Sequence, residues 1–255
     1  MRVTVCELRD TLPGLAQDWS ALVAHAKSER SDLVLLPEMP FCPWFGVASA
    51  FDAHVWQAAV AAHDAWQARL AELAPAIVLG SRPVNRGTQR LNEAFRWTLD
   101  AGCHAAHHKC HLPNEDGFWE AEWYERGDGS FSPVRCGAAL VGFEICTELW
   151  ALEQARTYGK AGVHIIVTPR ATPISTLDKW VVGGRATAVC SGAFSLSSNH
   201  VSTNADPVHL GGRGWIIAPD GDVIGVTSSS EPMITAELDL ALADAAKHTY
   251  PRYVF

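Results

Sequence analysis

Three residues of complementary chemistry each come at the end of a run that reads as a buried strand. They are the carboxylate Glu38, the cation Lys109 and the thiol Cys146. The carboxyl ends of strands in open α/β sheets form the crevice in which ligands bind. A thiol there can act as a nucleophile with a buried carboxylate as its base, although Glu38 also fits a salt-bridged core residue and Lys109 alone fits a surface lysine. The sequence therefore predicts a thiol-dependent site built from these three residues.

Cys146 has the strongest case among the seven cysteines. A helix predicted from Trp150 onward would place the positive end of its dipole near the thiol and lower the thiol pKa toward the reactive thiolate. The other six read as ordinary reduced thiols: Cys6 and Cys190 fit a core, Cys42 fits a core or a pocket wall, and Cys103, Cys110 and Cys136 lie near strand ends without an obvious chemical neighbourhood.

A cluster of histidines around Lys109 invites a metal interpretation. The cluster contains His104, His107, His108 and His111, with Cys110 among them. Alternation along a strand would put His104, His108 and Cys110 on one face and His107 and His111 on the other. That would split the set, and no second group at zinc spacing occurs elsewhere in the sequence. We therefore expect solvated or hydrogen-bonded histidines and no metal.

The elements that must position these residues alternate between short apolar strands and amphipathic helices. Strands are predicted at residues 2–8, 33–36, 76–81, 92–99, 103–108, 138–145, 163–167, 193–198, 215–218, 223–226 and 234–238, and helices at about 15–26, 51–73, 150–161 and 177–190. This order favours a mixed sheet layered between helices in a single α/β domain over residues 1–255. The polar, aromatic segment 112–129 is a long loop of the kind that usually carries function.

The composition excludes several classes of protein. The chain has 255 residues, of which 48% are hydrophobic and 19% charged, and a formal net charge of −8. This mixture is unlike a disordered chain or a coiled coil, and the negative charge disfavours nucleic acid and anionic membranes as partners. No apolar stretch approaches the roughly 20 residues that span a bilayer, and no secretory signal opens the chain. We expect a cytoplasmic protein with reduced thiols.

Three ordered motifs give the chain a resemblance to the nitrilase, or carbon–nitrogen hydrolase, superfamily. Leu36-Pro37-Glu38 resembles the family's base motif, His108-Lys109-Cys110-His111-Leu112-Pro113 its lysine motif, and Gly142-Phe143-Glu144-Ile145-Cys146 its nucleophile motif. Residues 161–169, 185–199 and 214–221 resemble later elements of the family, so the resemblance covers nearly the whole chain. It implies a four-layer α-β-β-α sandwich that pairs into homodimers or larger homo-oligomers and needs no metal or organic cofactor.

The resemblance also implies a role for each residue. Glu38 would be the general base, Lys109 the cation that stabilises a tetrahedral intermediate, and Cys146 the nucleophile. A second glutamate of the family is best matched by Glu120, with Glu115 as the competing candidate. The implied reaction is hydrolysis of a small linear amide or N-carbamoyl amine to an acid and ammonia or an amine through a thioester. The alternative is a nitrilase that converts a nitrile to its acid with the same residues.

Two other classes of function are less consistent with these residues. A non-catalytic scaffold built on the same sandwich predicts the loss of a catalytic residue, and all three are present. A papain-like thiol protease needs a histidine and an asparagine as partners of the cysteine in a different fold.

Further residues are candidates for substrate binding. The backbone N–H of Thr147, directly after the nucleophile, is a candidate donor to the oxyanion. Arg170 would bind a substrate carboxylate through a bidentate pair, or else pair with a local carboxylate. An aromatic pocket is expected from Trp44, Trp119, Trp123, Trp150 and Trp180, with Trp119 the candidate contact, whereas Trp19, Trp56 and Trp66 lie on helical stripes that indicate packing or a subunit interface.

Overall fold

The computed structural model describes residues 1–202 and 208–254. The strands are β1 Arg2–Leu8, β2 Leu33–Leu35, β3 Ile77–Arg86, β4 Gln89–Thr98, β5 Gly102–His108, β6 Val134–Cys136, β7 Ala139–Phe143, β8 Ile165–Arg170, β9 Phe194–His200, β10 Trp215–Ile217, β11 Val223–Val226 and β12 Met233–Glu237. The helices are α1 Gly14–Glu29, α2 Ala53–Gln67, α3 Glu120–Trp123, α4 Leu152–Lys160, α5 Leu177–Ser191 and α6 Leu240–Ala246. Within the described residues, no helix is both long and apolar enough to cross a membrane.

The strands form two mixed halves that join along one parallel pair. One half runs β12-β1-β2-β3-β4-β5 and the other β11-β10-β9-β8-β7-β6. They meet where Glu7 and Leu8 of β1 pair with Asn199 and His200 of β9. Strands β1, β2 and β3 are parallel, and so are β7, β8 and β9. Because β5 and β3 are both antiparallel to β4, β5 ends at the same edge as β2.

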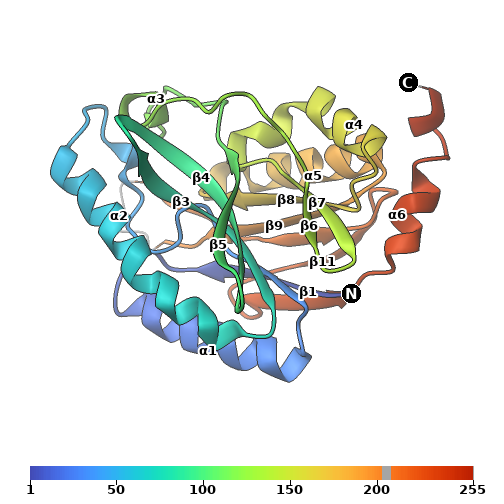
Figure 1. The fold of residues 1–255 in the computed structure, drawn as a ribbon, viewed down its shortest axis with the longest axis horizontal. Coiled ribbons are helices and arrows are strands. Elements are labelled where there is room, and N and C mark those ends of the chain that lie inside the picture. The colour runs from blue at the N-terminus through green and yellow to red at the C-terminus, as the bar shows by residue number, and fades with distance from the viewer. Residues whose placement is uncertain (203–207, 255) are drawn as a thin grey trace.

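Helices cover the outer face of each half, which produces four layers (Figure 1). Trp19 of α1 and Val34 of β2 belong to one buried apolar cluster in the first half, and Tyr158 of α4 and Ile166 of β8 belong to another in the second. The largest buried cluster, between the halves, takes Val3, Val5 and Leu35 from the first and Val141, Phe143 and Val167 from the second. Each such buried side chain contributes roughly 1.5–3 kcal/mol of hydrophobic free energy. The α-β-β-α sandwich that the resemblance implied is confirmed.

The apolar runs of the sequence have a simple structural cause. Along β8, Ile165 and Val167 face the other half of the sandwich, whereas Ile166 faces α4. Alternate side chains of a strand point to opposite faces, so a strand covered on both faces is apolar throughout.

The structure differs from the sequence predictions in several elements, among them α3, which lies in the segment predicted as a loop, and α2, which ends at Gln67 rather than at residue 73. Strand β3 continues to Arg86 rather than ending at residue 81, because Arg82 and Arg86 form cross-strand ion pairs with Glu93 of β4, which apolar periodicity does not register. The sequence prediction also did not include the short strand β6 or the helix α6. The side chain of Asp239 caps the N-terminus of α6. Helix α4 begins at Leu152 rather than at Trp150.

Candidate active site

A pocket of about 260 Å³ lies where the predicted residues converge. Glu120 and Cys146 line this pocket. Lys109, which follows β5, donates a hydrogen bond to Glu120, and its charge acts on the thiol of Cys146. Glu38 follows β2, and Cys146 follows β7. The carboxyl edges of both halves thus supply the site, as expected for an α/β sheet. A larger hollow of about 540 Å³ beside α4 and α5 has none of these four residues in its described lining.

Lys109 lies between two carboxylates in the protein interior. Its Nζ donates hydrogen bonds to Oε1 of Glu38 at 2.8 Å and to Oε2 of Glu120 at 2.5 Å. Asn92 donates to the same oxygen of Glu38 at 2.8 Å, and the Tyr124 hydroxyl donates to Glu120. Within the described chain, the second oxygens of Glu38 and Glu120 are buried without a hydrogen-bond partner. Each carboxylate therefore keeps one oxygen free for a proton or a substrate.

The charges of this cluster shift one another's pKa values. Burial alone would lower the pKa of Lys109, but the charges of Glu120 and Glu38 outweigh burial and raise that pKa above its usual range. Burial raises the pKa of Glu120 to about 7, against the attraction of Lys109 and helped by repulsion from Glu38. Lys109 is thus a permanent cation, while Glu120 changes its charge near neutral pH.

Cys146 begins a 3₁₀ turn, Cys146–Trp150, at the end of the strand segment. Its φ of 50° lies in the left-handed region, a strained conformation for a residue with a side chain and one that clusters at functional sites. Burial and the charge of Glu38 raise the pKa of its thiol well above the ordinary value, although Lys109 opposes them. The expected lowering of this pKa by a helix dipole is therefore wrong: α4 begins six residues later, and desolvation dominates. The resting thiol is neutral and needs a base.

Two of the residues predicted to bind substrate, Thr147 and Trp119, differ in their position relative to the pocket. Thr147 lines the pocket, together with the aromatic side chains of Phe118, Trp150 and Trp180. Trp119 is half-buried and outside that lining, and its backbone N–H donates to Gly46 at 2.8 Å. Of the five tryptophans expected in an aromatic pocket, Trp44 packs on Phe118 and Trp123 packs on Phe45.

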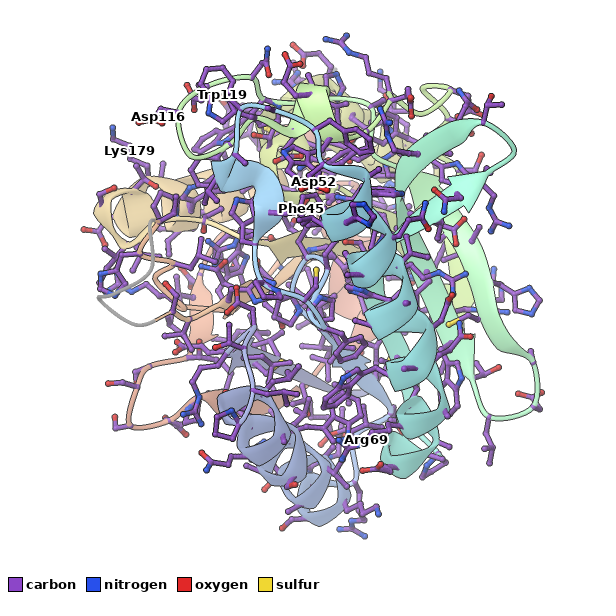
Figure 2. All side chains as sticks on the ribbon, turned by 90° about the vertical axis from the view of Figure 1, so that its left-hand side faces the viewer. Phe45, Asp52, Arg69, Asp116, Trp119 and Lys179 are labelled. Atoms are coloured by element: carbon purple, nitrogen blue, oxygen red, sulfur yellow. The ribbon has the colours of Figure 1, made fainter. Side chains whose placement is uncertain are left out.

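Glu115 and Lys179 lie at the exposed rim of the same pocket. Glu120, rather than Glu115, is the glutamate that contacts Lys109. In Figure 2, Lys179 lies at the same end of the molecule as Asp116 and Trp119, beside the loop that carries the two glutamates. Lys179 is a basic side chain at this rim. The sequence analysis did not identify it, because no local pattern distinguishes this lysine on α5 from a surface lysine.

Comparison with known proteins agrees with this geometry. Residues 2–248 match the carbon–nitrogen hydrolase family. The chain belongs to that family. Among curated relatives, it is 27% identical to a glutamine-dependent NAD(+) synthetase of Rhodobacter capsulatus over 95% of this chain and 44% of that protein. It is 24% identical to a chloroplastic omega-amidase of Arabidopsis thaliana over 90% of this chain and 64% of that protein.

A solved structure supports the fold. A carbon–nitrogen hydrolase from Helicobacter pylori G27 superimposes with a TM-score of 0.89 at 19% identity, covering 100% of this chain and 94% of that one. The chain spans less than two thirds of the length of the first curated relatives that it matches. The comparison therefore establishes the family and the fold of this carbon–nitrogen hydrolase, and its reaction is argued from the site.

Arg170 is fully buried at the end of β8 and is outside the described lining of the pocket. Its guanidinium donates to Ser197 Oγ at 2.7 Å, to Thr172 Oγ1 at 2.6 Å and to the Arg213 carbonyl at 2.7 Å, and it stacks 4.2 Å from the Trp215 ring centre. Burial lowers its pKa to about 9. Because Thr172 does line the pocket, Arg170 supports the pocket wall through that side chain.

Glu148, two residues after the nucleophile, joins the two segments that carry Lys109 and Cys146. Its Oε1 accepts from the backbone N–H of Cys110 at 2.8 Å, and its Oε2 accepts from that of Ile145 at 2.9 Å. Burial opposes ionisation of Glu148, but hydrogen bonds from His107 and His111 hold its pKa well below the usual range.

The expected separation of His107 from Cys110 is wrong. Strand β5 ends at His108, so alternation no longer governs Cys110, and both side chains contact Glu148. Cys110 therefore has a polar neighbourhood that the sequence pattern did not indicate.

Proposed function

We propose that this chain is a cysteine-dependent hydrolase of non-peptide carbon–nitrogen bonds, which cleaves small linear amides to an acid and ammonia or an amine. The observation that carries the proposal is the buried ion cluster in which Lys109 bridges Glu38 and Glu120 beside the thiol of Cys146. Burying a cation with two carboxylates opposes folding, because all three charges lose their hydration. Such a cluster therefore indicates a functional site.

The first half-reaction follows from the charges of the cluster. Glu38 takes the proton of the neutral Cys146 thiol, and the sulfur attacks the amide carbon. The carbonyl oxygen becomes an oxyanion, for which Lys109 and the backbone N–H of Thr147 are the proposed donors. When the carbon–nitrogen bond breaks, Glu38 returns its proton to the leaving nitrogen, and a thioester on Cys146 remains.

The second half-reaction uses the same base. Glu38 takes a proton from water as the hydroxide attacks the thioester carbon, and Cys146 leaves with that proton. Glu120 positions Lys109 through their 2.5 Å hydrogen bond and places a free oxygen near the substrate nitrogen. These steps consume one water and use groups that this chain itself supplies.

The pocket rim suggests the class of amide. Lys179 offers a cation to a substrate carboxylate, and Glu115 offers an anion to an amino group. The curated relatives include omega-amidases from Xenopus tropicalis and Arabidopsis thaliana. We therefore propose, as the preferred substrates, amides that carry a carboxylate at the end opposite the amide group. N-carbamoyl amines are the second choice, and one relative is named an N-carbamoylputrescine amidase, from Oryza sativa subsp. japonica. Nitriles are the alternative substrate.

Ammonia release from four matched compounds tests the proposal: an ω-amide with a carboxylate, its neutral analogue, an N-carbamoyl amine and the corresponding nitrile. We expect the carboxylate-bearing amide to turn over fastest. Cys146→Ser and Glu38→Gln should each lower kcat/KM by about 10³-fold or more, whereas Cys190→Ser, in a thiol outside the site, should not. Turnover of the nitrile alone, or full activity of Cys146→Ser, would overturn the proposal.

The family resemblance also leads us to propose an oligomeric state. We expect the chain to pair with copies of itself, and Val182 on α5, which is 63% exposed, is an apolar side chain available for such a contact. Sedimentation velocity of the wild type and Val182→Glu measures this pairing. A monomer at micromolar concentration would contradict it. The cytoplasmic location also stays a prediction.

A further inference from the structure

Four side chains with metal-ligand chemistry converge beside the nucleophile turn. His107, Cys110 and Glu148 each offer a ligand atom, and these atoms all lie within 4.8 Å of one another. Nδ1 of His111 lies 3.7 Å from Oε1 of Glu148 and 3.6 Å from Sγ of Cys110. None of these side chains takes part in the proposed reaction, so the cluster is separate from the catalytic chemistry.

Three contacts among these side chains have a spacing close to that of ligands in a tetrahedral zinc site. Bonds of about 2.0–2.1 Å to nitrogen or oxygen and about 2.3 Å to sulfur imply ligand-to-ligand distances of roughly 3.3–3.6 Å. The observed distances are 3.3 Å from Cys110 Sγ to Glu148 Oε1, and 3.6 and 3.7 Å for the two contacts of His111. The contact of His107 Nε2 with Glu148 Oε2 is 2.9 Å and needs only a small opening.

The ring of His107 is already oriented as a ligand would be. Its Nδ1 lies 2.8 Å from the carbonyl oxygen of Ser130, which can only accept. Its Nε2 lies 2.9 Å from Oε2 of Glu148, so the second ring nitrogen faces the cluster. A ring nitrogen held by a backbone carbonyl is how proteins orient metal-binding histidines.

We infer that His107, Cys110, His111 and Glu148 form a binding site for a divalent ion of the Zn²⁺ class. On binding, Cys110 releases its thiol proton to solvent, and the ion forms bonds to Cys110 Sγ, to His107 Nε2 and His111 Nδ1 as unprotonated nitrogens, and to one oxygen of Glu148. The metal replaces the thiol proton and oxidises or reduces nothing. The Cys/His/His/Glu set suits Zn²⁺ and disfavours Mg²⁺ and Ca²⁺, which prefer oxygen ligands.

The position of the site gives the ion a structural consequence. Cys110 directly follows Lys109, and Glu148 belongs to the turn that begins with Cys146. A bound ion adds a second connection between the segments that Glu148 already joins through Cys110 and Ile145. Because the ligand atoms come together only in the folded chain, ion binding raises the unfolding temperature.

Titration with Co²⁺ and Zn²⁺ in a Cys146→Ser background tests the site, because this background removes the catalytic thiol as a competing ligand. We expect one Co²⁺ per chain with a sulfur-to-cobalt charge-transfer band, displaced by Zn²⁺ but not by Mg²⁺. Adding Cys110→Ser should abolish the band and weaken binding by roughly 100-fold or more. Adding Cys103→Ser, which removes a thiol of β5 outside the cluster, should change neither.

A second variant keeps the test decisive if Cys110→Ser does not fold. His111 is half-exposed, so His111→Ala should fold and still weaken Co²⁺ binding and reduce the Zn²⁺-dependent rise in unfolding temperature. The inference is overturned by failure of the Cys146→Ser chain to bind one equivalent, or by a thiolate band that persists without Cys110. Neither outcome depends on catalytic activity, so the test is independent of the proposed hydrolysis.

Discussion

The Nζ atom of Lys109 lies 2.5 Å from Oε2 of Glu120, with both side chains buried. Glu120 is the second glutamate of the site. It is the first residue of α3, a helix of four residues in the loop that follows Lys109. The Tyr124 hydroxyl, one helical turn later, donates to the same carboxylate. The loop is therefore held to the sheet edge by the charge that it contributes to the site.

Replacing Glu120 by glutamine should separate its charge from its shape. We expect Glu120→Gln to lower kcat/KM by about 100-fold or more, because the amide holds Lys109 less firmly and withdraws an electrostatic partner from the transition state. Steady-state ammonia release measures the loss. Two control variants share the loop: Glu122→Gln on the same short helix, and Glu115→Gln at the rim. A larger loss in Glu115→Gln would assign the second glutamate to that residue.

The raised pKa of Glu120 predicts a pH dependence of stability. Burial raises this pKa to about 7 in the folded chain, from about 4.5 when unfolded, so between these pH values the folded state holds more protons. The contribution of the protonated group is complete below pH of about 4.5 and is lost as pH rises through about 7. The unfolding free energy of wild type minus that of Glu120→Gln should therefore fall between pH 5 and about 8, as urea titrations can measure. A difference that rises over that range would contradict the assignment.

The sequence predicted the three residues at strand ends because strand ends are visible in it. Glu38 and Cys146 each follow an apolar run, and Lys109 follows a strand of small and histidine side chains. The partners of these residues carry no such signal. Asn92 lies within β4 and Tyr124 after α3, and both reach the site through pairing of segments distant in the chain. Tertiary placement, rather than local pattern, decides their role.

Exchanging Arg170 for methionine should distinguish a substrate contact from support of the pocket wall. The guanidinium is fully buried and bonds three protein oxygens, including that of Thr172. Arg170→Met keeps much of the volume but leaves these acceptors unpaired, at a cost of about 1–3 kcal/mol in unfolding free energy. We expect kcat/KM to fall by the same factor for a carboxylate-bearing amide and for its neutral analogue. A loss confined to the carboxylate-bearing amide would instead make Arg170 a substrate-binding residue.

Lys179 should behave in the opposite way. An exposed ion pair contributes about 0.2–1 kcal/mol, so we expect Lys179→Met to raise KM for the carboxylate-bearing amide by about two- to fivefold and to leave the neutral analogue unchanged. Added salt should shrink the difference, because the rim is open to solvent. Lys27→Met removes the same charge from the exposed surface of α1 and serves as the control. An equal effect of both variants would attribute the change to net charge.

The limits of the sequence are clearest where regular alternation stops. A strand continued through Cys110 would separate that thiol from His107, and the end of β5 at His108 brings them together on Glu148. A dipole at Cys146 likewise required a helix that begins in the structure only at Leu152. The predicted strand already ended at His108, so the first error was to extend its alternation past that end, whereas at Cys146 burial of the thiol outweighed any helix dipole.

Glu148 should be essential to the geometry of the site without touching the substrate. Its two oxygens accept from the backbone N–H groups of Cys110 and Ile145, which flank Lys109 and Cys146. In Glu148→Gln one acceptor becomes an NH₂ group that faces a backbone donor, and the carboxylate charge beside His107 is lost. We expect the unfolding free energy to fall by about 2–4 kcal/mol.

Activity should fall along with stability in this variant, because the turn and the lysine lose their common anchor. We expect kcat of Glu148→Gln to drop by about 10- to 100-fold at a temperature where the chain is folded, with KM nearly unchanged, since misplacing reacting groups slows chemistry more than it weakens binding. Glu153→Gln, in the first turn of α4 and exposed, is the control. If Glu148→Gln loses stability but retains kcat, then the bond to Ile145 and Cys110 supports the fold and does not position the nucleophile.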